Sequence, residues 1–268
     1  MNSKVLAKNM RRDALLMTNK GSAEHIGPIL SITDIVAVLY ANVMKHDPKQ
    51  PKHPNRDRFI LSKGHAGACV YAALAECGYF DVSELIETYV KNNSTYSGHV
   101  SHKNNPGVEF STGSLGHGVG VAAGMALAAK MDKKSYRVFA LAGNGEMSEG
   151  SIWETIMFAG HNKLSNFKLI VDDNRLQRLG ASEKILDMSN LEDRIASFGF
   201  KCVRIDGHNH KELEKALSWF DKSCPTAVIC NTIKGKGVSF MENDNVWHGK
   251  TVTGELLEQA LREVEEAK

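Results

Sequence analysis

The stretch GNGEMSEGSIWETIMFAGHNKLSNFKLIVDDN, residues 143–174, decides the fold that we expect. It follows the apolar run 138–142, contains a Gly-X-Gly turn and a segment of helical periodicity, and ends on a second apolar run, 169–171, with polar residues after it. This order predicts a strand, a turn, a helix and a strand. In an open parallel sheet, ligands bind beyond the carboxyl ends of the strands, so we expect Asn144 and Asn174 at one shared site.

Strand and helix patterns also alternate along the rest of the chain. Strands are expected at residues 58–62, 201–205 and 227–231, and helices at residues 5–20, 69–77, 115–128, 190–198, 211–220 and 256–264. This alternation is typical of an α/β fold with a doubly wound, mainly parallel sheet and helices on both faces, and residues 1–268 are predicted to form a single domain. Ser31 to Asp34 is interpreted as a capping box that opens a further helix.

Composition gives little reason to propose a charged macromolecular partner. The formal charge of +2 comes from 33 basic and 31 acidic residues spread along the chain, so neither nucleic acid nor a membrane surface is expected. No apolar run is expected to be long enough to cross a bilayer, and the amino terminus lacks a signal-peptide core, which favours a cytoplasmic protein. The five cysteines lack metal-ligand pairing and are expected to be buried, reduced thiols.

Histidines form a second group of candidate residues. Five of them fall in glycine-flanked loops or at helix starts: His25, His65, His99, His117 and His248. Each one alone is better explained as a solvated or capping residue, but five at one sheet edge predict a polar pocket that binds a hydroxylated or phosphorylated ligand. The remaining six are expected at the surface: His46, His53, His102, His161, His208 and His210.

The turn formed by Gly143, Asn144 and Gly145 is a weak signal by itself, because such turns are common in α/β proteins. At the end of a strand it would present backbone N–H groups and a helix amino terminus to a phosphate. The amide oxygens of Asn144 and Asn174 would suit Mg²⁺, which prefers oxygen ligands shared with phosphates. A magnesium ion bound to a diphosphate is the expected occupant.

Together these residues resemble the thiamine-diphosphate domain of the transketolase family, and specifically the amino-terminal subunit of transketolases that are split into two chains. The resemblance covers nearly the whole chain and rests on motifs at residues 61–66, 107–118, 124–128, 143–150, 160–164 and 247–249. The thiamine signature of the family runs from Gly-Asp-Gly to an Asn, and here Asn174 stands 30 residues after Asn144.

The resemblance implies a role for each candidate residue. Asn144, Asn174 and the backbone carbonyl of Leu176 would bind Mg²⁺. Thiamine diphosphate would be held by His65, Ser114, Leu115, Gly116, Gly143, Asn144, Gly145, Glu146, Asn174 and His248. Catalytic roles are implied for His25, His65, His99, His248, Glu149 and Glu154. By spacing alone the two glutamates are ordinary carboxylates near a helix start, whereas the resemblance places them in a carboxylate network that links cofactors across subunits.

The implied activity moves a two-carbon ketol unit from a ketose or ketose phosphate to an aldose, with thiamine as the electron sink. The glutamate that activates the aminopyrimidine belongs, in this family, to a pyrimidine-binding domain that this chain lacks. We therefore expect the chain to be active only with a companion subunit, in an α₂β₂ assembly. Two alternatives stay open: a thiamine-dependent relative with a 2-oxo acid or another non-standard donor or acceptor, and a non-catalytic scaffold subunit.

Three positions depart from the family pattern. Asn144 stands where the family has aspartate, which removes one negative charge from the expected cation site and predicts weaker magnesium and cofactor binding. Ile26 replaces the proline of the usual His-Pro-Gly and is expected to loosen the loop of His25. Leu179 stands where an aspartate usually precedes Gly180. A specialised donor or acceptor would accommodate all three.

Overall fold

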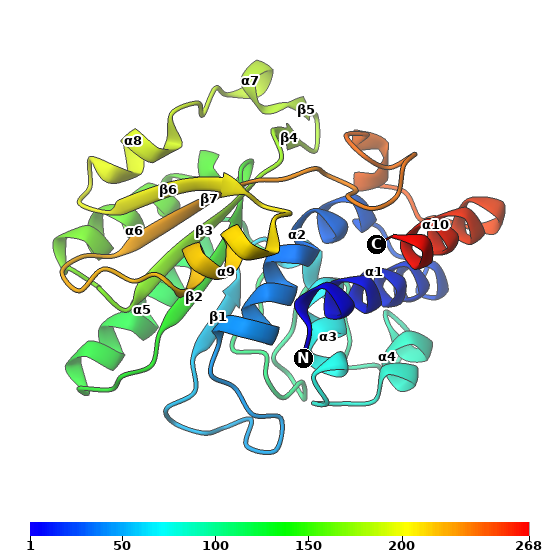
Figure 1. Ribbon diagram of the computed structural model, residues 1–268, viewed down its shortest axis with the longest axis horizontal. Helices are drawn as coiled ribbons and strands as arrows, with labels where there is room; N and C mark the ends of the chain where they lie inside the picture. Colours follow the sequence, from blue (N-terminus) through cyan, green and yellow to red (C-terminus); the bar gives the residue numbers. More distant parts are fainter. Residues whose placement is uncertain (268) are drawn as a thin grey trace.

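A parallel sheet of five strands forms the centre of the structure, a computed structural model that describes residues 1–267 (Figure 1). Across the sheet the strands are β1 (Arg58–Leu61), β2 (Val138–Gly143), β3 (Phe167–Asp173), β7 (Thr226–Asn231) and β6 (Lys201–Asp206). The register pairs Gly143 with Asp172, and Asp173 with Asn231, so the carboxyl ends of β2, β3 and β7 meet at one edge. The predicted parallel α/β fold is confirmed.

Helices cover both faces of the sheet (Figure 1). The core on one face includes α1 (Ser3–Lys20), α2 (Ile26–Val38), α3 (Gly67–Glu76), α9 (His210–Ser218) and α10 (Gly254–Glu266), and the core on the other includes α5 (His117–Met131), α6 (Gly150–His161) and α8 (Leu191–Ala196). Alternate strand residues enter the two cores: Leu141 of β2 faces the first, and Ala140 and Ala142 face the second. The shorter elements are η1 (Leu39–Val43), η2 (Gly64–Ala66), α4 (Val82–Thr88), η3 (Glu146–Ser148), β4 (Leu176–Gln177), β5 (Gly180–Ala181), α7 (Ser182–Ile185) and η4 (Asn245–His248).

Helix α2 begins at Ile26, so the interpretation of Ser31 to Asp34 as a capping box is wrong. Pro28 lies in the first turn, where a helix does not need the missing N–H and where the fixed backbone angle of proline favours helix. Ser31 and Asp34 therefore lie inside the helix, and both are buried. Their side chains serve tertiary contacts: Ser31 Oγ donates to Asp172 Oδ1 at 2.7 Å.

The segment Ile26–Val43 also corrects the expectation that no apolar run could cross a bilayer. Its 18 residues have a mean hydropathy of 1.7, which satisfies length and composition for a membrane span. In the fold 89% of the segment is buried, and α2 packs against α1, α3, α9 and η4. The hydrophobicity of this segment is thus accounted for by its place in the core.

The cysteines agree in part with expectation. All five are free thiols, and the structure of residues 1–267 shows Cys69 and Cys230 buried and Cys77, Cys202 and Cys224 half-buried. Burial raises the pKa of the Cys69 thiol to about 12, which keeps it protonated and unreactive.

A buried ionic cluster surrounds Asp34 of α2. Arg11 donates to both of its carboxylate oxygens at 3.0 and 2.6 Å, and ring nitrogens of His208 and His210 lie 2.7 and 3.1 Å from them. Burial alone would raise the pKa of Asp34, but the charge of Arg11 and the hydrogen bonds hold it well below its ordinary value. The surface expectation is therefore wrong for His208 and His210, and for the half-buried His46, while the other three histidines of that group are exposed.

Asp34→Asn is expected to lower the free energy of unfolding by about 3–5 kcal/mol at pH 7, because it leaves the Arg11 charge buried without a counter-charge. Since the pKa of Asp34 is depressed in the folded state, its contribution is fully present above the unfolded pKa of about 3.9 and is lost as the pH falls through the folded value. Urea unfolding at pH 7 and at pH values below about 4 measures both effects. Glu87→Gln, in an exposed pair with Lys20, is the control and should change little; an equally small effect of Asp34→Asn would contradict the assignment.

Candidate active site

The carboxyl end of β3 is held by Asp172, a carboxylate with no solvent exposure. Lys63 Nζ lies 2.6 Å from Asp172 Oδ2, and Asn174 Nδ2 lies 3.2 Å from the same oxygen. The hydroxyls of Ser31 and Thr232 donate to the other oxygen, Oδ1. A buried carboxylate is costly unless it is paired and hydrogen-bonded, and this one is both. Through these contacts Asp172 connects α2, the loop after β1 and the end of β7.

Asn144 and Asn174 lie just beyond β2 and β3 and are nearly buried, with 5% and 7% exposure. The backbone N–H of Asn144 donates to the Asp172 carbonyl at 2.9 Å, and its side-chain Nδ2 donates to Ser182 Oγ at 2.6 Å. Asn174 Oδ1 accepts the N–H of Leu176 at 3.0 Å. The two amides therefore have fixed orientations, and their meeting at one sheet edge confirms the spatial prediction.

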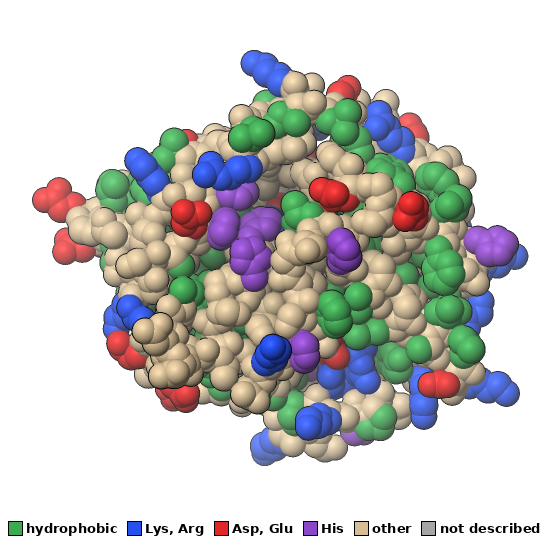
Figure 2. All heavy atoms as spheres, turned by 180° about the vertical axis from the view of Figure 1, so that it is seen from behind, with side chains coloured by type: hydrophobic (Ala, Val, Ile, Leu, Met, Phe, Trp, Pro, Cys, Tyr) green, Lys and Arg blue, Asp and Glu red, His purple; other side chains and the backbone are tan. Residues whose placement is uncertain are grey.

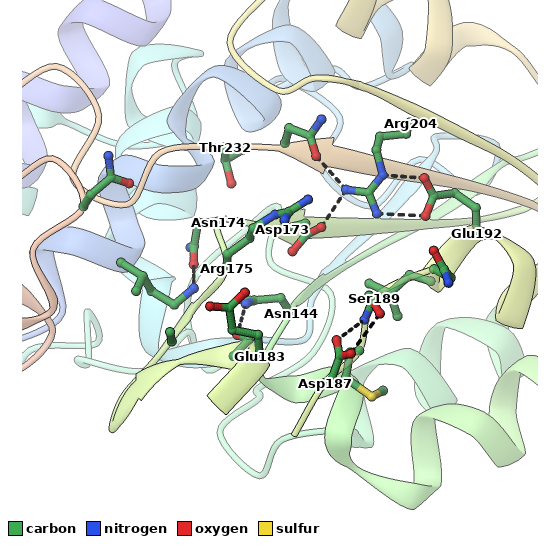
Figure 3. Close-up of a pocket in the computed structure, with 18 residues that line it drawn as sticks. Asn144, Asp173, Asn174, Arg175, Glu183, Asp187, Ser189, Glu192, Arg204 and Thr232 are labelled. Atoms are coloured by element: carbon green, nitrogen blue, oxygen red, sulfur yellow. Dashed lines mark hydrogen bonds and ion pairs between the residues drawn. The ribbon is translucent and has the colours of Figure 1, made fainter. Parts of the chain in front are cut away.

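Two cavities share the wall formed by Asn144, Asn174 and Leu176. The larger, of about 620 Å³, opens beside residues 181–192, and Figure 3 shows Arg204 between Asp173 and Glu192 in its wall. Arg204 pairs with both of these carboxylates, and Glu183 and Asp187 also line this cavity. The residues expected to be catalytic lie elsewhere.

The smaller cavity, of about 430 Å³, brings together four of the five predicted histidines. The ring centroid of His25 lies 5.2 Å from that of His65, 5.8 Å from that of His99 and 5.4 Å from that of His248. Figure 2 shows histidine side chains gathered at a hollow on one face of the molecule. The prediction is wrong for His117, which is exposed at the start of α5 and does not line the cavity.

The loop of His25 is anchored, contrary to what the replacement of proline by Ile26 was expected to cause. Ile26 is fully buried in the first turn of α2. The backbone of His25 has a φ of 77°, a left-handed conformation that is uncommon outside glycine, and its N–H donates to the His248 carbonyl at 3.1 Å. Tertiary contacts thus fix the position of this histidine.

Three histidines of the cavity, His25, His65 and His248, have lowered pKa values, which favours their neutral form. Burial, and then the charge of Lys63, lowers the pKa of His65 well below its ordinary value, and burial also lowers the pKa of His25. Burial and the charge of Lys234 lower the pKa of His248 to about 3; Lys234 Nζ lies 3.0 Å from His248 Nδ1. Neutral imidazoles carry one donor and one acceptor, which suits them to hydroxyl groups.

The glycine turn after β2 does not lead directly into an α-helix, so the prediction that the turn presents a helix amino terminus is wrong. The 3₁₀ turn η3 intervenes, and α6 begins at Gly150. Glu146, with 2% exposure, folds back and accepts the N–H of Gly143 at 3.2 Å and that of Gly116 at 2.7 Å. Burial raises the pKa of Glu146, while these hydrogen bonds oppose the rise. Its carboxyl group joins the two glycine loops.

The remaining predicted residues divide between the cavity and the surface. Leu115, Gly143, Gly145, Glu146 and Glu149 line the histidine cavity, whereas Ser114 and Glu154 are exposed and do not. Sequence reasoning missed Lys63, Gln177, Arg178 and Lys234, which also line it. A signal for the two lysines existed: Lys63 stands two residues after β1 and Lys234 three residues after β7, each directly before a glycine.

The cavity fits a diphosphate with an associated cation. Gln177 Nε2 is a buried donor with no partner among residues 1–267, and Gln177 packs on Gly145, where an added Cβ would lie 3.1 Å from Gln177 Cγ. In the described part of the chain no three His, Cys, Asp or Glu side chains are grouped to hold a metal ion. A cation here would therefore depend on the oxygens of Asn144, Asn174 and Leu176 and on those of the phosphate, the ligand type that Mg²⁺ prefers.

Comparison with known proteins gives consistent matches. Residues 2–264 match the family described as transketolase, thiamine diphosphate binding domain. The chain is 39% identical to a 6-deoxy-6-sulfo-D-fructose transketolase subunit of Clostridium sp., covering 97% of this chain and 94% of that protein, and 39% identical to one of the apulose-4-phosphate transketolase subunits of Phocaeicola vulgatus, covering 97% and 92%. The crystal structure of transketolase from Campylobacter jejuni superposes with a TM-score of 0.92 at 32% identity, over 99% of this chain but 43% of that one.

His248→Gln is expected to make the protein less sensitive to acid. The folded pKa of His248 is depressed, so between about pH 6.5 and about pH 3 the unfolded chain binds a proton that the folded chain does not, and stability falls as the pH falls through that window. Glutamine keeps an acceptor for Lys234 without titrating. The loss of unfolding free energy between pH 7.5 and 5.0, measured in urea, should be smaller in the variant. His161→Gln, at an exposed histidine, should leave this loss unchanged, and the same result for His248→Gln would refute the interpretation.

Proposed function

Because the chain belongs to the transketolase family, in its thiamine diphosphate-binding domain, we propose that it is the diphosphate-binding subunit of a two-chain transketolase. The assembled enzyme moves a two-carbon ketol unit from a ketose or ketose phosphate to an aldose. The observation that carries the proposal is the group of four histidines that meet in one cavity beside Asn144 and Asn174. The near-complete coverage of two subunit-sized relatives supports a split enzyme, and their names support a specialised ketose donor.

Some residues of the cavity bind the cofactor, and others bind the sugar substrate. Thiamine diphosphate supplies the electron sink for carbon–carbon bond cleavage. Asn144, Asn174 and the Leu176 carbonyl hold Mg²⁺, and His65, His248 and Gly145 hold the diphosphate. Leu115, Gly143 and Glu146, which line the same cavity, hold the rest of the cofactor. His25 and His99 donate and accept hydrogen bonds with the hydroxyls of the donor. Imidazole groups can also exchange protons with these hydroxyls near neutral pH.

A companion subunit completes the site and supplies the pyrimidine-binding half. Glu149 at the open side of the cavity and Glu154 on α6 are both exposed, so they are accessible to a second chain. An α₂β₂ assembly in the cytoplasm is part of the proposal. The most sugar-specific contacts would then lie on the companion chain.

Co-expression with the product of the adjacent open reading frame tests the proposal. The purified complex should bind thiamine diphosphate with Mg²⁺ and convert a ketose donor and an aldose acceptor into the two exchanged sugars, detected by mass spectrometry. Either chain alone should be inactive. A complex that binds no thiamine diphosphate would support a scaffold subunit, and turnover of 2-oxo acids in place of ketoses would support the other alternative.

Asn144→Asp should lower the magnesium concentration needed for thiamine diphosphate binding by about tenfold, because a carboxylate restores the charge that complements the dication. Ser182, which now accepts from the Asn144 amide, can donate to the new carboxylate instead. Calorimetric titrations of the cofactor at several magnesium concentrations measure the change. Asn190→Asp adds the same charge at an exposed position in the larger cavity and is the control. An unchanged or higher magnesium requirement for Asn144→Asp would contradict the proposal that the missing carboxylate weakens cation binding.

A further inference from the structure

We propose that Arg178 binds the terminal phosphoryl group of the cofactor and supplies positive charge that a weakly held cation at Asn144 does not. The inference rests on the proposed function, since it concerns the diphosphate end of the same cavity. It assigns a cofactor-positioning role to Arg178, a residue that no pattern in the sequence singled out.

The placement of Arg178 brings its guanidinium to the histidine cavity. Arg178 directly follows β4 and lines the cavity with His248 and Gly145. The guanidinium lies against Gly249: a Cβ added to this glycine would be 2.6 Å from Arg178 Nη2. The position of the guanidinium therefore depends on the absence of a side chain at residue 249. Asn245 Nδ2 donates to the Arg178 carbonyl at 2.7 Å and fixes the backbone from which the side chain extends.

The donors of Arg178 are available for a ligand. Within residues 1–267 its guanidinium forms no hydrogen bond or ion pair, whereas Lys63 is paired with Asp172, and Lys234 is bonded to Asn245 and His248. Of the three cations that line the cavity, Arg178 therefore has the unused donors.

The adjacent residue provides an independent observation. Gln177 Nε2 is buried without an acceptor among residues 1–267, and Gln177 packs against Gly145. Buried polar groups in folded proteins nearly always have partners, so this donor indicates an acceptor group in the complete site. Two consecutive residues thus present unsatisfied N–H groups to one cavity, and a phosphoryl oxygen is an acceptor for both.

The charge balance of the cavity favours an anion at this place. Both side-chain positions of the expected cation site are neutral amides, Asn144 and Asn174. Asp172 is neutralised by Lys63, and Glu146 accepts backbone N–H groups. Glu149, which also lines the cavity, is exposed to solvent. A diphosphate that is only partly neutralised by metal would be stabilised by a guanidinium, which binds phosphate in a bidentate manner through charge-assisted hydrogen bonds.

The test is calorimetric titration of thiamine diphosphate and of thiamine monophosphate into the complex with the companion subunit. Arg178→Gln should weaken thiamine diphosphate binding by at least about tenfold, and thiamine monophosphate binding by less than about threefold. Arg175→Gln is the matched control: Arg175 is exposed, stands three residues away, and lines only the larger cavity. It should change neither affinity. Urea unfolding should show equal stability for both variants and the parent, since both side chains are exposed.

Combination with Asn144→Asp adds a second readout. At saturating magnesium, Arg178→Gln should cost less affinity in the Asn144→Asp background than in the parent, because a tightly held dication then neutralises the diphosphate. An additive loss would contradict the charge-compensation account.

The outcomes separate the inference from the function on which it rests. Equal losses for the two thiamine phosphates, or diphosphate affinity within about twofold of the parent, would overturn the assignment. It would also be overturned if Arg178→Gln raised only the KM for a phosphorylated donor, which would make Arg178 a substrate residue. In these cases the parent complex still binds the cofactor and the proposed function stands, whereas a parent complex that binds no thiamine diphosphate would overturn both.

Discussion

The site depends on one buried negative charge, that of Asp172 at the end of the central strand. A carboxylate without solvent exposure must be compensated by donors whose positions are fixed. Lys63, Ser31 and Thr232 come from three different parts of the chain, and each is held in place by satisfying Asp172. The same carboxylate fixes the amide of Asn174. Fold and site are therefore coupled at this residue: the packing of α2 on the sheet also positions a predicted cation ligand and the lysine beside the histidines.

The parts of the fold that follow from local patterns were predictable. The alternation of apolar strands and helices indicated the parallel sheet, and the Gly-X-Gly turn indicated the edge where Asn144 and Asn174 meet. The failures share one physical cause, which is long-range contact. Ser31 resembles a helix cap by spacing, but its hydroxyl is bonded to Asp172, 141 residues away. His208 is polar and stands in a loop, yet its ring is bonded to Asp34 on a helix that no local pattern connects to it.

In the candidate site, too, some features follow from local sequence patterns and others depend on long-range contacts. Four of the five histidines that stand in glycine-flanked loops or at helix starts meet in one cavity, as predicted. His117 fits the local rule equally well, but it is exposed at the start of α5 and does not line the cavity. Lys234 was missed because lysines are usually solvated, and only its burial beside His248 reveals that its charge acts on the imidazole. The larger cavity has none of the predicted histidines in its lining, although it shares Asn144 and Asn174 with the smaller one.

The burial of Ile26–Val43 has a consequence for biosynthesis. Of the main packing partners of this apolar segment, only α1 precedes it in the chain, while α3, α9 and η4 are translated after it. Until η4 at Asn245–His248 has left the ribosome, part of the apolar surface of this helix is exposed on the nascent chain. Such a surface can associate with other unfolded chains. We therefore expect slow elongation or truncation between the synthesis of this helix and that of η4 to favour aggregation.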